Sequence, residues 1–126
     1  MFTHAFSGFS VSDVDEAKKF YSDVLGLTAE VESMGILTIT LPGGAKVIAY
    51  PKGGDHVPAT FTILNFEVDD IDAAVDELNA KGVVTKIYDG LFTDDKGVQR
   101  GKASGEGPDI AWFRDPSGNV LSVLNG

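Results

Sequence analysis

The chain contains one short pattern twice, and this repeat constrains its fold more than any other feature. The first copy reads FSVSDVDEAKKFY from Phe9, and the second reads FEVDDIDAAVDEL from Phe66, at a constant offset of 57 residues. The offset pairs Phe with Phe, Val with Val, Asp with Asp and Ala with Ala. In each copy a short alternating strand leads into the start of a helix. We therefore expect two related α+β modules.

The length of 126 residues fits a single domain that is built from both modules. A module of about 60 residues buries too little surface to be stable alone, so the modules are expected to share a core or to pair with another chain. The segment PKGGDHVPA has two prolines, two glycines and no periodicity, which is typical of a linker. The sequence thus predicts one domain over 1–126, with module one at 1–50, a linker at 51–59 and module two at 60–126.

The composition excludes several classes of function. The chain has no cysteine, so disulfides, thiol nucleophiles and thiolate metal sites are excluded. Its net charge of −9 and lack of a basic run oppose binding to nucleic acid and to anionic membrane surfaces. The same charge is explained by a solvated acidic surface, or it favours a cationic ligand. No apolar stretch approaches a membrane span and no signal peptide is visible, so we expect a cytoplasmic protein.

Hydrophobic periodicity predicts strand, helix and three strands in each module. The first strand is expected at 4–11, with Phe9 and Val11 facing the helix, whereas His4, Phe6 and Gly8 share the other face with Ser10. A helix is expected to begin at Ser12 or Asp13 and to end near Leu25, before Gly26. The other expected elements are strands at 28–33, 36–41, 46–50, 60–68, 83–88, 110–114 and 119–124, and a helix at 70–80.

The segment 89–109 is longer than a hairpin connection and is rich in Gly, Asp and Lys. Long loops in compact domains are often functional. Apolar residues within it, Leu91, Phe92 and Val98, favour a lid that folds over an apolar ligand. A mobile surface excursion without a role is the alternative.

Two motifs carry a resemblance that covers essentially the whole chain. With VSDVDEAKKFYSDVLGL in module one and FRDPSGNVLSVL closing module two, the sequence resembles the vicinal oxygen chelate superfamily of glyoxalases, bleomycin-resistance proteins, fosfomycin-resistance enzymes and extradiol dioxygenases. The resemblance implies two βαβββ modules that form paired half-barrels around a cavity. In its metal-dependent members, His, Glu or Gln on the first and last strand of each module hold a divalent ion. One fold of this kind hosts many chemistries.

The ligand positions that this resemblance implies are occupied by other residue types. They fall on Phe6, on Ile63, on Ser122, and on Ile48 or Ala49. These side chains do not supply the three or four nitrogen or oxygen donors that a divalent site needs. We therefore expect no metal and no cofactor.

Histidines and acidic residues are the other candidates for catalytic or metal-binding groups. His4 is a shifted ligand or a proton-transfer group, or else a surface residue, and the same alternatives apply to His56 in the linker. Acidic residues at the helix starts, namely Asp13, Asp69, Asp70 and Asp72, are interpreted as capping or first-turn acids. Asp115 is interpreted as part of the DPSG turn.

The pattern as a whole favours an apolar, aromatic pocket with few polar groups, which suits a small hydrophobic or amphipathic molecule. The predicted ligand-binding residues are Phe6, Tyr50, Ile63, Asn65, Trp112 and Ser122. The leading hypothesis is a metal-independent protein that binds and sequesters such a molecule. The alternatives are a divergent lyase, isomerase or dioxygenase, with relocated metal ligands or with His4 and Tyr50 as acid–base groups, and a structural partner protein. A homodimer is expected, because closed two-fold pairing is the commonest assembly.

Overall fold

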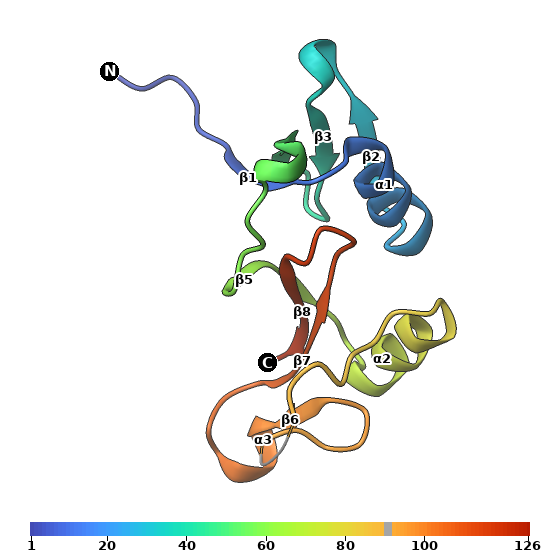
Figure 1. The fold of residues 1–126 in the computed structure, drawn as a ribbon. Helices are drawn as coiled ribbons and strands as arrows, with labels where there is room; N and C mark the ends of the chain where they lie inside the picture. Colours follow the sequence, from blue (N-terminus) through green and yellow to red (C-terminus); the bar gives the residue numbers. More distant parts are fainter. Residues whose placement is uncertain (90–91) are drawn as a thin grey trace. The chain divides into compact units, whose positions relative to one another are not determined.

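The computed structural model describes residues 1–89 and 92–126. The chain divides into two compact units (Figure 1). Unit 1 comprises residues 1–58 with 116–118, and unit 2 comprises residues 59–115 with 119–126. Each unit holds a four-stranded sheet and a helix that follows the first strand. The predicted α+β fold with two βαβββ modules is confirmed.

The sheet of unit 1 has the order β1-β4-β3-β2. It consists of β1 (Ser7–Val11), β2 (Thr28–Val31), β3 (Leu37–Thr40) and β4 (Lys46–Pro51). Strand β1 runs parallel to β4, and the other neighbours are antiparallel. Helix α1 (Val14–Lys19) continues into the π-helical turn η1 (Phe20–Val24), and the short 3-10 turns are η2 (Ser33–Gly35) and η3 (Gly53–Asp55).

The core of unit 1 lies between α1–η1 and one face of its sheet. The helix begins where predicted, because the Asp13 side chain accepts a hydrogen bond from the Glu16 N–H at 2.9 Å. Phe9 packs against Tyr21 with ring centroids 5.9 Å apart, and Val11 is fully buried. The expectation that Phe9 and Val11 face the helix is therefore confirmed.

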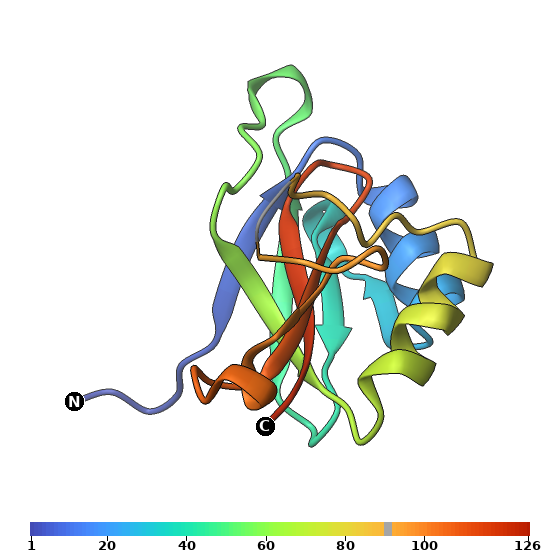
Figure 2. The same cartoon turned by 90° about the horizontal axis from the view of Figure 1, so that it is seen from below.

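The sheet of unit 2 has the order β5-β8-β7-β6. Its strands are β5 (Thr62–Glu67), β6 (Val98–Arg100), β7 (Asp109–Arg114) and β8 (Val120–Asn125), with β5 parallel to β8. Helix α2 (Ile71–Ala80) packs against β7 and β8 (Figure 2). Asp70 caps it by accepting the Ala73 N–H at 3.0 Å. The four-residue helix α3 (Gly101–Ser104) follows β6.

Alternation along the strands gives the sheet of unit 2 two different faces. On β7, Phe113 is fully buried while its neighbour Trp112 is half-buried. The buried face, which carries Phe113, includes Val98, Ala111, Leu121 and Val123. The opposite face, called here the open face of unit 2, carries Asn65, Ser122 and Trp112.

The predicted strand at 83–88 is wrong. No strand forms there, and the Thr85 hydroxyl instead donates to the Lys96 carbonyl at 2.7 Å and accepts from Asn79. Residues 85–86 lie so close to Gly97 that a Cβ on that glycine would meet the Thr85 carbonyl oxygen at 2.0 Å. The second strand of the module is instead β6, which follows a turn closed by a hydrogen bond from the Gly97 N–H to the Asp94 carbonyl oxygen and pairs with β7.

The single loop predicted for 89–109 is also wrong in part. The segment contains β6 and α3, and Val98 belongs to the core rather than to a lid. Phe92 is 72% exposed. Gly90 and Leu91 lie outside the described residues.

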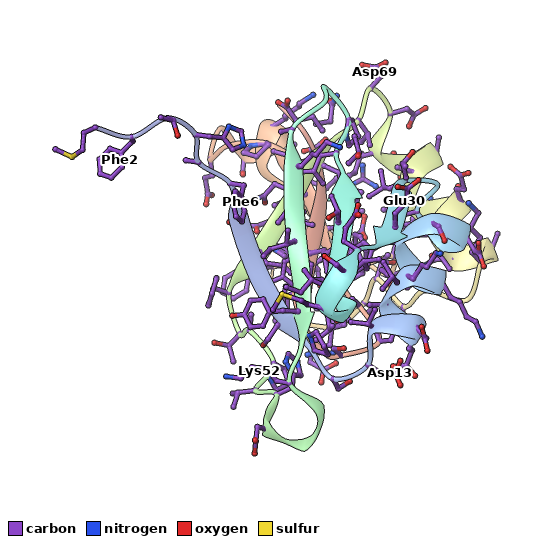
Figure 3. The ribbon with its side chains drawn as sticks, turned by 90° about the horizontal axis from the view of Figure 1, so that it is seen from above. Phe2, Phe6, Asp13, Glu30, Lys52 and Asp69 are labelled. Atoms are coloured by element: carbon purple, nitrogen blue, oxygen red, sulfur yellow. The ribbon has the colours of Figure 1, made fainter. Side chains whose placement is uncertain are left out.

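The first strand begins later than predicted, at Ser7. Its pairing with the parallel strand β4 starts at Ser7, which lies opposite Val47, one residue after β4 begins. His4 and Phe6 therefore precede the strand, and Figure 3 shows Phe2 farther along the same extended segment. Phe6 is 63% exposed.

Candidate functional site

A row of three side chains crosses the open face of unit 2. Ser122 on β8 lies opposite Asn65 on β5 and opposite Trp112 on β7. Ser122 is fully buried, and its hydroxyl donates to Asn65 Oδ1 at 2.6 Å. Three residues predicted as ligand-binding are thus brought together by strand register.

The aromatic part of this row is extended by Tyr88. Its ring meets Trp112 edge to face, with centroids 5.5 Å apart. Sequence reasoning missed Tyr88, because the residue was assigned to a strand that does not form. Both rings keep part of their surface exposed, so the pair offers an apolar surface to a ligand.

The polar part of the row is Asn65, which is exposed. Since Ser122 donates to its carbonyl oxygen, the amide nitrogen is directed elsewhere, and it has no hydrogen-bond partner within residues 1–89 and 92–126. An amide nitrogen in this state offers two N–H donors. The arrangement can therefore hold an acceptor oxygen of a ligand beside an aromatic surface.

The other three predicted ligand-binding residues are not part of this row. Ile63 precedes Asn65 on β5, at an irregularity in the pairing between Thr62 and Leu64. Tyr50, in unit 1, lies opposite Ser10 at the end of β4 and is 39% exposed. Phe6 precedes β1.

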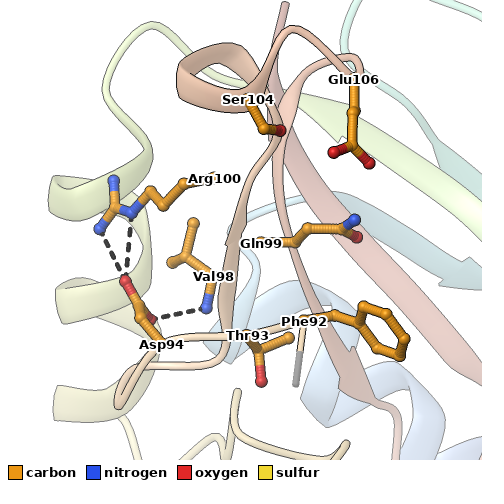
Figure 4. A pocket seen from close by; sticks show the side chains of 8 residues that line it. All are labelled: Phe92, Thr93, Asp94, Val98, Gln99, Arg100, Ser104 and Glu106. Carbon is orange, nitrogen blue, oxygen red and sulfur yellow. Dashed lines mark hydrogen bonds and ion pairs between the residues drawn. The ribbon is translucent and has the colours of Figure 1, made fainter. Parts of the chain in front are cut away.

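A separate pocket of about 410 Å³ lies beside β6 in unit 2 (Figure 4). Phe92, Gln99 and Glu106 point to one side of the strand, whereas Arg100 and Asp94 point to the other. The remaining lining residues are Thr93, Val98 and Ser104. None of the residues predicted for ligand binding lines this pocket.

Five charged side chains join the segment 94–100 to helix α2. Arg100 donates to both carboxylate oxygens of Asp72, at 2.7 and 3.1 Å, and to Asp94 at 3.1 Å. Lys96 lies 2.8 Å from Asp76 and 3.3 Å from Asp72. We call these residues the β6 charge cluster. Asp72 lies in the first turn of α2, as predicted, and its carboxylate also pairs with Arg100 and Lys96.

The cluster shifts the pKa values of its members. The pKa of Asp72 is lowered to about 2, mainly by its hydrogen bonds from Arg100 and to a smaller extent by the one from Lys96. Partial desolvation of the carboxylate acts in the opposite direction and raises its pKa. Burial alone would raise the pKa of Asp94, but hydrogen bonds from the Val98 N–H, from Arg100 and from the Lys96 N–H together lower it. The bond to Asp76 raises the pKa of Lys96, and the bond to Asp72 raises that of Arg100.

Of the alternatives given for His56, that of a surface residue in the linker is wrong. The ring is half-buried in unit 1, and both of its nitrogens are hydrogen-bonded. Nδ1 lies 2.8 Å from Ser10 Oγ, and Nε2 lies 2.8 Å from the Ser117 carbonyl oxygen. His4, in contrast, is exposed and contacts Phe6 with ring centroids 6.2 Å apart. No hydrogen bond or ring contact joins His4 to Tyr50 in the described part of the chain.

Comparison with known protein families shows to which family the chain belongs. The profile of the glyoxalase/bleomycin resistance protein/dioxygenase superfamily matches residues 3–123. The chain belongs to this superfamily. Comparison with curated proteins gave no significant match.

Several solved structures share the fold of the chain. An integron cassette protein from the mobile metagenome of the Halifax Harbour sewage outfall is 18% identical, with a TM-score of 0.70 over 99% of this chain and 100% of that one. TnmS3, an antibiotic binding protein from Streptomyces sp. CB03234, is 23% identical, with a TM-score of 0.66 over 99% and 98%. The fosfomycin resistance protein FosX from Listeria monocytogenes is 12% identical, with a TM-score of 0.70 over 100% and 94%.

The residues of this glyoxalase-superfamily protein do not fit the divalent ion that metal-dependent members bind. Ile48, two residues before Tyr50 on β4, and Ile63 on β5 offer no donor atom. The Ser122 hydroxyl is engaged by Asn65. Within residues 1–89 and 92–126, no group of three or more His, Asp or Glu side chains is arranged to hold a metal ion. In the same residues no helix is long and apolar enough to cross a membrane.

Proposed function

We propose that this superfamily member binds a small apolar or amphipathic organic molecule on the open face of unit 2, without a metal ion, and thereby sequesters it. The observation that carries the proposal is the row formed by Asn65, Ser122 and Trp112, which sets a fixed polar group beside an aromatic surface. Sites for small organic ligands typically combine apolar walls with a few placed polar groups.

Each part of the row has a distinct task in this proposal. Trp112 and Tyr88 provide the surface against which a ring or alkyl portion of the ligand packs, since edge-to-face aromatic pairs present large apolar areas. Asn65 donates to an acceptor such as a carbonyl or hydroxyl oxygen. Ser122 positions the Asn65 amide by binding its oxygen. A ligand that lacks the acceptor leaves the amide unpaired, which costs binding free energy.

The relatives support a binding function of this kind. TnmS3 is described as an antibiotic binding protein, and FosX is described as a fosfomycin resistance protein. Both descriptions refer to small organic molecules, namely an antibiotic and fosfomycin. At sequence identities of 23% and 12%, these similarities establish a shared fold and do not identify the ligand of this chain.

Fluorescence titration tests the proposal directly, because Trp112 is the single tryptophan of the chain. Bleomycin, fosfomycin and the amphipathic dye 8-anilinonaphthalene-1-sulfonate serve as probes, in buffer with a chelator. We expect at least one aromatic probe to quench the Trp112 emission saturably. Quenching by none of the aromatic probes at concentrations up to the millimolar range would contradict the proposal.

Variants of the row assign the binding to it. We expect Asn65→Ala to weaken binding of a probe with an acceptor oxygen by about fivefold to tenfold, the equivalent of roughly 1 to 1.4 kcal/mol for one hydrogen bond. Val84→Ala, an exposed apolar change elsewhere in unit 2, serves as the matched control and should leave the affinity unchanged. If both variants bind alike, the ligand lies elsewhere. If binding requires an added divalent ion, the protein is instead a divergent metal enzyme of the superfamily.

We also propose that the protein forms a homodimer. Members of fold families built from half-barrel modules complete their barrels within or between chains, and two-fold assemblies are the commonest. Static light scattering at micromolar concentration should give twice the chain mass of 13.3 kDa. A mass of one chain would contradict this part of the proposal.

A further inference from the structure

Ser10, His56 and the carbonyl group of Ser117 form a continuous hydrogen-bonded chain in unit 1. Ser10 Oγ lies 2.8 Å from His56 Nδ1, and His56 Nε2 lies 2.8 Å from the Ser117 carbonyl oxygen. Ser10 and His56 are both half-buried. Their positions are separated by 46 residues, so the fold, rather than local sequence, brings them together.

The Ser117 carbonyl determines which nitrogen of His56 carries the proton. A carbonyl oxygen accepts hydrogen bonds and cannot donate one, so Nε2 must carry a hydrogen. In the neutral imidazole Nδ1 then has a lone pair, and it accepts the hydroxyl proton of Ser10. A serine whose proton points at the free nitrogen of an oriented imidazole has the arrangement of an activated nucleophile.

Strand geometry places this serine on an accessible face. Phe9 and Val11 are buried against the helix side of the sheet, so Ser10 between them points to the opposite face. Tyr50 lies beside it on the neighbouring strand β4 and is partly exposed. The Ser10 hydroxyl is therefore not enclosed in the core of unit 1.

We propose that Ser10 is a nucleophile that accepts an acyl group from small activated esters, with His56 as general base and the Ser117 carbonyl as the group that orients the imidazole. This site lies in unit 1 and is independent of the ligand site proposed in unit 2.

The reaction is an ordinary acyl transfer followed by hydrolysis. Ser10 Oγ forms a bond to the ester carbonyl carbon while its proton passes to His56 Nδ1. The bond between that carbon and the alcohol oxygen breaks, and the leaving alcohol takes the proton from His56. Water then attacks the acyl-serine with the same imidazole as base, which releases the carboxylic acid and restores Ser10.

Covalent labelling and hydrolysis test the site. The protein is incubated with an alkyl fluorophosphonate and digested, and the modified peptide is identified by mass spectrometry. In parallel, release of 4-nitrophenol from 4-nitrophenyl acetate is followed over the background rate. We expect one phosphonyl group per chain on Ser10, and hydrolysis that is lost in Ser10→Ala.

The variant His56→Gln separates a nucleophilic role from a structural one. A glutamine can donate to the Ser117 carbonyl and accept from Ser10, but it cannot take up a proton. We expect this variant to keep the wild-type melting temperature within a few degrees and to lose reactivity by about 100-fold, the lower end of what a general base contributes.

Ser12 supplies the matched serine control. Its hydroxyl lies 3.1 Å from Ser117 Oγ but contacts no imidazole in the described residues. Ser12→Ala should therefore leave the labelling rate unchanged. Labelling that is absent from Ser10, or that proceeds at an equal rate in His56→Gln, would overturn the proposal and leave the three groups as a structural link between the end of β1, the 56–58 segment and the turn at 116–118.

Discussion

Arg100 and Asp72 form an ion pair through two parallel hydrogen bonds, with N–O distances of 2.7 and 3.1 Å. Arg100 lies on the edge strand β6, and Asp72 lies in the first turn of helix α2. Bidentate arginine–carboxylate pairs are the geometrically specific kind of salt bridge. The pair therefore fixes the short edge strand of unit 2 to the helix that covers the sheet.

The pH dependence of stability should report this pair. The pKa of Asp72 is lowered from 3.8 to about 2 in the folded protein, so its carboxylate stays charged to lower pH than in the unfolded chain. Its contribution to stability is complete above about pH 4 and is lost as the pH falls toward 2. Urea unfolding at several pH values should show this loss for the wild type and a smaller one for Asp72→Asn.

Asp76→Asn is the control for that measurement, because Asp76 contacts Lys96 but not Arg100. It should retain the steep loss of stability between pH 4 and 2. An Asp72→Asn profile that is parallel to the wild type through this window would show that the pair does not contribute.

Gly97 should tolerate no side chain. It has a φ of +88°, and an added Cβ would meet the Thr85 carbonyl oxygen at 2.0 Å and the Lys86 Cα at 2.9 Å. Gly82→Ala is the matched control, since Gly82 has a similar φ of +85° with nothing within 4 Å. Backbone strain alone should cost Gly82→Ala about 1–2 kcal/mol. Gly97→Ala should cost clearly more by urea unfolding, and equal losses would contradict the close approach of 85–86 to 97.

Phe113 should be a principal contributor to the core of unit 2. Its side chain is fully buried on the face of β7 that packs against helix α2. Phe113→Ala should lower the free energy of unfolding by about 3–5 kcal/mol, because it removes apolar contacts and leaves a cavity. Phe92→Ala removes the same side chain from an exposed position and should change stability by less than about 0.5 kcal/mol. A loss below 1 kcal/mol for Phe113→Ala would contradict the assigned burial.

The parts of the fold that depend on local pattern were predictable from the sequence. Asp13 and Asp70 cap the two helices as expected, because an aspartate before an apolar-periodic run has few other local roles. The repeat and the alternation around Phe9 located the first strand and its buried face. The strand predicted at 83–88 does not form, because a strand also needs a partner to pair with. The local pattern of VVTKIY contains no information about whether such a partner is within reach.

The candidate sites depended on long-range contacts, and the sequence predicted them only in part. Strand register had to bring Asn65 opposite Ser122, whose positions are separated by 57 residues, and the superfamily pattern pointed to that strand face. Nothing local marked His56 as more than a linker residue, because its partners Ser10 and Ser117 are 46 and 61 positions away. The same holds for Arg100, which is 28 positions from Asp72.

Calorimetric titration of metal-stripped protein tests metal-free binding at the Asn65–Ser122–Trp112 row most directly. The probe is the compound that quenches Trp112 most strongly, titrated into protein dialysed against a chelator and analysed for its metal content. We expect about one molecule bound per chain, with an affinity equal to that of untreated protein and tenfold or more weaker for Trp112→Ala. Recovery of about one equivalent of divalent metal per chain from untreated protein, with binding lost after chelation and restored by that metal, would contradict the account.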